Sequence, residues 1–123
     1  MTLEISTVRG VGWLVFDRPD AGNAINAQMF RDLEMAWRDL EADSAVRAIV
    51  NTGNGRSFQT GLDVVQLARD KDALRASSRQ TRDFELRMTG WHCGVTKPVI
   101  AAVNGTCAGG GLHFVADADV VIA

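Results

Sequence analysis

The sequence has few of the residues from which disulfide frameworks and metal sites are built. Among its 123 residues are two cysteines and two histidines. Cys93 and Cys107 lie far apart and form no CxxC pair, so we interpret both as buried, reduced thiols. His92 and His113 have no neighbours at metal-ligand spacing, and we therefore predict no metal site.

Long apolar runs and blocks of one charge are also missing. No stretch approaches the roughly 20 apolar residues of a membrane-spanning helix, and the first residues lack the basic start and apolar run of a signal peptide. The 13 basic and 15 acidic residues are mixed along the chain, so no basic block is available to neutralise phosphates. We therefore expect a cytoplasmic protein that binds neither membranes nor nucleic acid.

The size and composition suit one domain. Hydrophobic residues make up 46% of the sequence, enough for a real core in a chain that is too short for two ordinary domains. No repeat, low-complexity tract or proline-rich linker marks a boundary. Residues 1–123 are therefore treated as a single domain or as part of one.

Apolar patterning predicts strands that alternate with helices. Alternating or continuous apolar runs predict strands at Leu3–Val8, Val11–Phe16, 46–50, 99–103 and Val120–Ile122. The spacing of one helical face predicts a helix that begins after Asn26, its N-cap, with inward residues Met29, Leu33, Ala36, Trp37 and Leu40. A less buried helix is expected at about 73–88 and a short one at Leu112–Ala116. This alternation predicts an α/β fold.

Two glycine-bearing loops follow predicted strands, where exposed backbone amides are able to bind a developing negative charge. In the first loop, residues 58–63, Gly61 permits a turn that directs the amide of Thr60 or Gly61 into a cavity, and Asp63 fixes that turn. The second loop, Gly109–Gly111, leaves amides uncovered at the start of a helix. Each loop by itself is equally compatible with an ordinary turn or with close backbone packing.

The order of the motifs is more specific than any one of them. The sequence reads RP at 18–19, NAIN at 23–26, FQTGLD at 58–63, KPVIAAVNG at 97–105, AGGG at 108–111 and DVVIA at 119–123. This ordered set covers nearly the whole chain and resembles the enoyl-CoA hydratase/isomerase (crotonase) family. The resemblance implies a crotonase-like spiral of ββα units, here truncated and lacking the C-terminal helical region of the family.

The resemblance also implies an activity and a site. The family acts on acyl-CoA thioesters, often in fatty acid metabolism, and assembles as trimers or hexamers; coenzyme A is part of the substrate, so no separate cofactor is expected. By motif, the backbone amides of Thr60 and Gly110 form the oxyanion hole for the thioester enolate. The residues that the resemblance places against the substrate are Ala24, Phe58, Gly61, Leu62 and Asp63.

The sequence departs from the family at one catalytic position. His113 stands where typical hydratases have a glutamate, and the second glutamate of those enzymes would lie beyond residue 123. We expect a fragment of a longer protein in which His113 either transfers protons or only packs. His92 is interpreted as a packing or surface histidine and Asp119 as a structural residue.

Several functions therefore remain open. Enoyl-CoA hydration is the default prediction, with isomerisation, thioester hydrolysis or a carbon–carbon bond reaction as alternatives within the same family. A non-catalytic CoA-binding or assembly protein is the alternative from another class. A nucleotide-binding domain is disfavoured because AGGG at 108–111 is not a GxGxxG motif.

Overall fold

The structure is a computed structural model that describes residues 2–82 and 86–123. Five strands form the main sheet in the order β1-β2-β3-β5-β7. β1 (Leu3–Val8) and β2 (Val11–Phe16) form the predicted antiparallel hairpin, whose turn residues Arg9 and Gly10 both have positive φ, as tight hairpins require. β3 (Ala48–Gly53), β5 (Val99–Ala102) and β7 (Val120–Ile122) extend the sheet in parallel.

A second, two-stranded sheet lies apart from the main one. It pairs β4 (Ser57–Gln59) in parallel with β6 (Thr106–Cys107), two segments that are far apart in the sequence. β6 leads into the short 3-10 helix η2 (Gly109–Gly111) and then into α4 (Leu112–Ala116). This small sheet therefore brings the two predicted glycine loops to the same edge.

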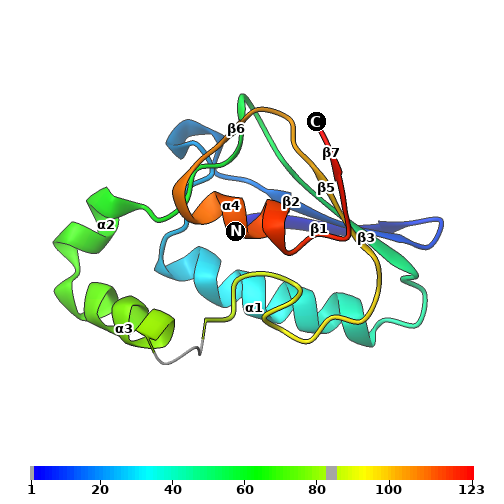
Figure 1. Ribbon diagram of the computed structural model, residues 1–123, viewed down its shortest axis with the longest axis horizontal. Helices are drawn as coiled ribbons and strands as arrows, with labels where there is room; N and C mark the ends of the chain where they lie inside the picture. The colour runs from blue at the N-terminus through cyan, green and yellow to red at the C-terminus, as the bar shows by residue number, and fades with distance from the viewer. Residues whose placement is uncertain (1, 83–85) are drawn as a thin grey trace.

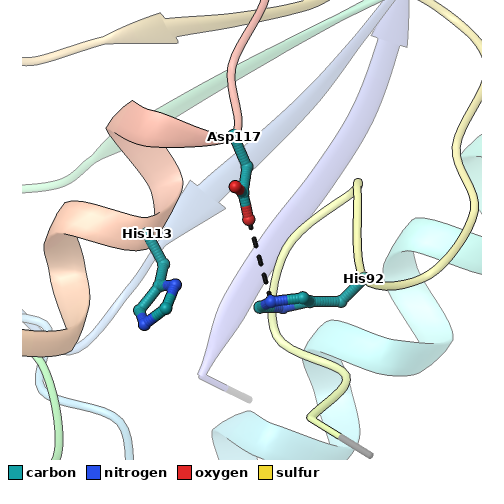
Figure 2. A group of neighbouring side chains, drawn as sticks. All are labelled: His92, His113 and Asp117. Carbon is teal, nitrogen blue, oxygen red and sulfur yellow. Dashed lines mark ion pairs between the residues drawn. The ribbon is translucent and has the colours of Figure 1, made fainter. Parts of the chain in front are cut away.

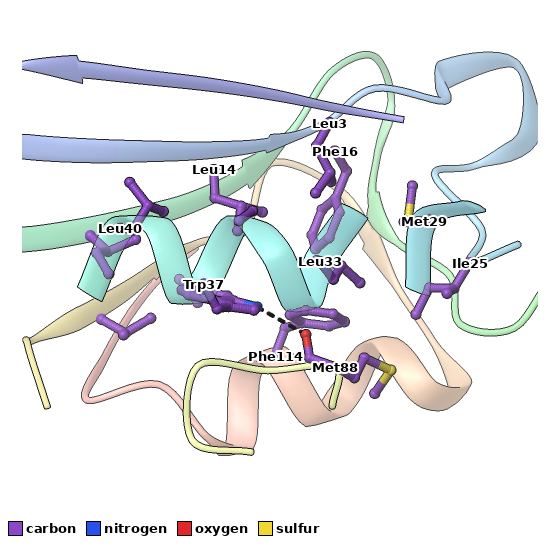
Figure 3. Close-up of a cluster of buried hydrophobic side chains, with 14 of the residues drawn as sticks. Leu3, Leu14, Phe16, Ile25, Met29, Leu33, Trp37, Leu40, Met88 and Phe114 are labelled. Carbon is purple, nitrogen blue, oxygen red and sulfur yellow. Dashed lines mark hydrogen bonds between the residues drawn. The ribbon is translucent and has the colours of Figure 1, made fainter. Parts of the chain in front are cut away.

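The core lies between the sheet and α1 (Ala27–Ala42), which runs along one face of the sheet (Figure 1). Asn26 caps α1 as predicted, because its side chain accepts a 2.8 Å hydrogen bond from the Met29 amide. The predicted inward face is confirmed, with Leu33, Trp37 and their neighbours buried against β1, β2 and α4 (Figure 3). Trp37 Nε1 also donates a 2.9 Å hydrogen bond to the carbonyl of Met88.

The remaining helices are short or lie at one side. η1 (Pro19–Ala21) follows β2, and α2 (Val64–Arg69) and α3 (Lys71–Arg82) project beyond the end of the sheet (Figure 1). Over residues 2–82 and 86–123, no helix combines the length and apolar character needed to cross a membrane.

The structure corrects the bounds of a predicted strand and a predicted helix, and it adds a helix that was not predicted. β3 spans Ala48–Gly53 instead of 46–50, because its pairing with β2 continues to Gly53, opposite Phe16. α2 was not predicted, since its Val64 and Val65 are exposed and form no inward apolar face. The helix expected at 73–88 is α3, which ends at Arg82; residues 83–85 of that prediction lie outside the described chain, and Met88 is buried in a non-helical segment.

Candidate functional site

The two glycine loops meet at the end of the small sheet. Gln59 pairs with Cys107, and its carbonyl accepts a 3.1 Å hydrogen bond from the Ala108 amide just before the glycines. Gly61 has φ +91, and a Cβ built on it would lie 2.7 Å from the Gly110 nitrogen. The backbones of Gly61 and Gly110 are therefore packed so closely that no side chain fits at Gly61.

The amides around this contact differ in their partners. The Gly61 amide donates to Gln59 Oε1 at 2.7 Å and the Gly111 amide donates to the Ala108 carbonyl at 2.9 Å. Among the backbone hydrogen bonds of turns and loops within residues 2–82 and 86–123, none is donated by the amide of Thr60 or of Gly110. The close contact of Gly61 with Gly110 thus brings together the two loops that carry the predicted oxyanion-hole amides, those of Thr60 and Gly110.

Two buried polar side chains, Gln59 and Asn23, hold this junction in place. Gln59 is fully buried, and its Nε2 donates a 2.7 Å hydrogen bond to the Asn23 carbonyl while its Oε1 accepts the Gly61 amide. Asn23 has φ +57, and its side-chain Nδ2 donates to the carbonyls of Ser57 at 2.9 Å and Phe58 at 3.2 Å. Neither role was predicted from the sequence, in which an Asn within a glycine-bearing turn was the available signal.

A cleft of about 560 Å³ opens beside the first loop, and three of the residues predicted to contact substrate, Ala24, Leu62 and Asp63, line it. Arg18 also lines the cleft and forms a 3.1 Å ion pair with Asp63. Asp63 Oδ1 accepts a 3.0 Å hydrogen bond from the Gln66 amide at the start of α2. This backbone hydrogen bond, followed by the Arg18 charge, holds the pKa of the Asp63 carboxyl below its usual value.

Phe58 does not line this cleft. Its ring is fully buried and packs edge-on against Phe16, with ring centroids 5.6 Å apart. The placement of Phe58 against the substrate is therefore corrected: its side chain belongs to the core.

His113 lies on α4 beside His92 and Asp117 (Figure 2). One ligand atom from each of the three residues lies within 4.8 Å of the others, and His92 Nε2 is 3.8 Å from Asp117 Oδ2. Burial lowers the pKa of His92, an effect that the Asp117 charge opposes. The two histidines that are isolated in the sequence are thus neighbours in space, and His92 is largely buried, which agrees with its interpretation as a packing histidine.

The two cysteines are free and half-buried, as expected for reduced thiols. Burial raises the pKa of Cys93 to about 11 and also raises the pKa of Cys107. Neither thiol has the low pKa of a nucleophile.

Comparison with known proteins shows similarity over the whole chain. The enoyl-CoA hydratase/isomerase family model matches residues 6–123. The "probable enoyl-CoA hydratase" of Rhizobium meliloti is 36% identical over 124 residues, covering 99% of this chain and 46% of that protein. An indene-carboxyl-CoA hydrolase of Mycobacterium tuberculosis is 33% identical over 114 residues, covering 93% of this chain and 45% of the hydrolase.

The fold agrees with these similarities. The crystal structure of an enoyl-CoA hydratase/isomerase from Mycobacterium paratuberculosis superposes with a TM-score of 0.83 at 31% identity, covering 98% of this chain and 47% of that one. The predicted α/β, crotonase-like fold is confirmed. The chain spans about half the length of the curated relatives it matches.

Proposed function

Because this chain belongs to the enoyl-CoA hydratase/isomerase family, we propose that it binds an acyl-CoA thioester and stabilises negative charge on the thioester oxygen. The observation that supports this proposal is the close contact between Gly61 and Gly110, which brings together the loops that carry the Thr60 and Gly110 amides. A thioester carbonyl gathers negative charge when the neighbouring carbon is deprotonated or attacked. An amide directed at such an oxygen contributes about 3 kcal/mol to transition-state stabilisation.

The cleft beside Thr60 supports binding of the coenzyme A portion. Leu62, Val64 and Val65 give it an apolar wall, while Arg18 and Arg69 supply cations for the phosphate groups. Ala24 lies in the same cleft, where the family motif places the segment along coenzyme A. Coenzyme A enters as part of the substrate, and the proposal needs no separate cofactor.

For the reaction, we propose hydration of a 2-enoyl-CoA with His113 as the proton-transferring group. His113 is exposed on α4, the helix that follows Gly111 directly, so the oxyanion amide and the imidazole belong to one continuous segment. Imidazole suits proton transfer near neutral pH. The proposal also includes a second acid or base in the whole protein and assembly as a trimer or hexamer. It further includes a cytoplasmic location and a role in fatty acid metabolism. The exposed Val120, Val121 and Ile122 of β7 offer an apolar edge for further chain or another subunit.

The test is hydration of crotonyl-CoA by protein whose intact mass has been measured, with His113→Ala and His113→Glu assayed beside it. We expect His113→Ala to lower kcat by about 10²- to 10⁴-fold with little change in acyl-CoA affinity. His113→Glu restores the family's carboxylate and is expected to recover part of that loss. Equal turnover by wild type and His113→Ala would remove His113 from the mechanism.

The second candidate is a non-catalytic protein that binds CoA thioesters. Replacement of the family's glutamate by His113 favours it. The same experiment separates the two functions, because this candidate predicts acyl-CoA binding with no turnover in any variant. Isomerase and hydrolase activities are tested on 3-enoyl-CoA and saturated acyl-CoA substrates in parallel.

A further inference from the structure

Outside the oxyanion loops, the structure gathers His92, His113 and Asp117 in one cluster (Figure 2). His113 lies on α4 and Asp117 is the C-cap of that helix; the Asp117 amide donates a 2.9 Å hydrogen bond to the His113 carbonyl, so the two side chains lie one turn apart on the same side. His92 comes from the segment before β5 and is largely buried, with 14% of its side chain exposed. The proposed function uses only His113, and the roles of the other two residues are not assigned by it.

The hydrogen bonds of His92 determine where its proton lies. Its Nδ1 accepts hydrogen bonds from the backbone amides of Met88 at 3.3 Å and Thr89 at 3.2 Å. A nitrogen that accepts carries no hydrogen, so neutral His92 has its proton on Nε2, the atom that faces Asp117. His92 is therefore a fixed donor at this site.

Asp117 is held in place from the same side. Its Oδ2 accepts a 2.7 Å hydrogen bond from the hydroxyl of Thr89, a buried residue whose Oγ1 in turn accepts the His92 amide at 3.3 Å. The Thr89 hydrogen bond restricts the orientation of the carboxylate, and His92 Nε2 lies 3.8 Å from the same oxygen. This leaves the carboxylate with acceptor capacity for the neighbouring ring of His113.

Two histidines and a carboxylate are also a common set of metal ligands. A ligating histidine, however, binds the metal with an unprotonated nitrogen and donates from the other nitrogen. His92 shows the reverse pattern, because its Nδ1 accepts two amides and its Nε2 must keep the proton. The cluster is therefore better suited to hydrogen bonding than to metal binding.

We propose that Asp117 is a positioning residue for His113: its carboxylate accepts the N–H of the inner ring nitrogen and leaves the outer nitrogen to take a proton. Figure 2 shows one ring nitrogen of His113 on the side of Asp117 and His92, and the other on the far side. A carboxylate that fixes the tautomer of a histidine and stabilises its cation serves the same purpose in hydrolase triads. This inference rests on the proposed function of His113.

In the proposed hydration, the proton balance is closed within the site. Water forms a bond to C3 of the enoyl thioester as one of its O–H bonds breaks, and that proton moves to the outer nitrogen of His113. Asp117 stays ionised and faces the resulting imidazolium. The same proton then passes to C2 as the enolate collapses, which returns His113 to its neutral form.

A first test does not need turnover. Nitrogen-15 NMR of the histidine rings reports which nitrogen of His113 is protonated in wild type, Asp117→Asn and the matched control Asp39→Asn, whose carboxylate is exposed on α1. We expect a single tautomer with the proton on the inner nitrogen in wild type and in Asp39→Asn, and a mixture in Asp117→Asn. An unchanged tautomer in Asp117→Asn would overturn the proposal. So would loss of the His92 Nε2–H signal on titration with Zn²⁺ alone.

The second test measures crotonyl-CoA hydration. We expect Asp117→Asn to lower kcat by about 10²- to 10⁴-fold with KM changed less than about twofold, and Asp117→Glu to recover part of the loss. Thr89→Val removes the supporting hydroxyl without altering α4 and is expected to lower kcat about tenfold. If Asp117→Asn does not fold, Thr89→Val tests the positioning role in its place. Equal kcat in wild type and Thr89→Val contradicts the proposal. If wild type shows no turnover while the tautomer still depends on Asp117, the proposed hydration fails and the positioning role stands.

Discussion

The hydroxyl of Thr60 donates a 2.8 Å hydrogen bond to the carbonyl of Gly22, and so joins the first glycine loop to the turn before α1. Gly22 has φ +60, and a Cβ there would lie 3.1 Å from Thr60 Oγ1. The side chain of Thr60 thus orients the backbone whose amide we assign to the oxyanion hole.

Loss of the Thr60 hydroxyl should therefore destabilise the protein without changing its shape. Thr60→Val is expected to lower the free energy of unfolding by about 1 kcal/mol, because the Gly22 carbonyl loses its partner. Thr60→Ser keeps the hydroxyl and serves as the control. Urea unfolding of the three proteins measures the difference, and identical midpoints for wild type and Thr60→Val would show that the hydrogen bond contributes nothing.

Gly61 and Gly94 allow backbone strain to be separated from crowding. Both have positive φ, +91 and +73, but a Cβ at Gly61 meets the Gly110 nitrogen whereas nothing lies within 4 Å of one at Gly94. Gly94→Ala is expected to cost about 1 kcal/mol of stability, and Gly61→Ala about 2 to 4 kcal/mol together with loss of acyl-CoA turnover. Thermal unfolding and the crotonyl-CoA assay provide the comparison. Equal losses in the two variants would mean that the loops are not in contact.

Gln59 allows a test of the buried hydrogen bonds that join Asn23 and Gly61. Gln59→Leu leaves the Gly61 amide and the Asn23 carbonyl without their buried partner, and we expect a loss of about 2 to 4 kcal/mol in the free energy of unfolding. The same change at exposed Gln28, whose side chain donates to Asp32, should cost less than about 0.5 kcal/mol. A loss of unfolding free energy in Gln59→Leu as small as that in the Gln28 control would indicate that these buried hydrogen bonds are dispensable.

The lowered pKa of His92 makes the stability of the protein depend on pH. Burial lowers the pKa of His92. The charge of Asp117 opposes this shift, and the charges of His113 and Arg87 add to it. The unfolded chain therefore binds the His92 proton more readily, so this contribution to stability is complete above about pH 6.5 and is lost as pH falls through that value towards the folded pKa. We expect His92→Gln to flatten the pH dependence of the unfolding free energy below pH 6.5. A steeper dependence in the variant would reverse the assigned sign.

Cys93 should be unreactive in the folded protein. With a pKa of about 11, roughly one thiol in a thousand is ionised at pH 8, against about a quarter for an ordinary cysteine. Alkylation by iodoacetamide at pH 8, followed by peptide mass spectrometry, is expected to label Cys93 at least about 100-fold faster in urea than in buffer. Rapid labelling of native protein would place this thiol in a different environment.

Much of the fold was predictable because it follows from local periodicity. The hairpin, the inward face of α1 and the Asn26 cap depend on residues close in the sequence, and each was confirmed. β4, β6 and α2 were missed, since strands of two or three residues carry no periodic signal and α2 exposes its valines.

The site was predictable only where backbone chemistry carries it. Gly61 and Gly110 were identified as site residues, and the structure places them in contact. The brace of Gln59 and Asn23 and the cluster of His92 with Asp117 depend on contacts between distant segments, for which one sequence gives no signal. The predicted contact of Phe58 with the substrate was missed because its ring packs against Phe16, a residue far away in the sequence.

The parallel pairing of Ser57 with Thr106 has a consequence for folding kinetics. Because Ser57 and Thr106 are far apart in the sequence, joining β4 to β6 closes a long loop, and the entropy lost in closing it is repaid only when the contact forms. We therefore expect Gly61 and Gly110 to come together late, after the hairpin and α1. In a refolding experiment, acyl-CoA binding should lag behind the recovery of helical circular dichroism, so that ligand binding marks the final maturation of the nascent protein.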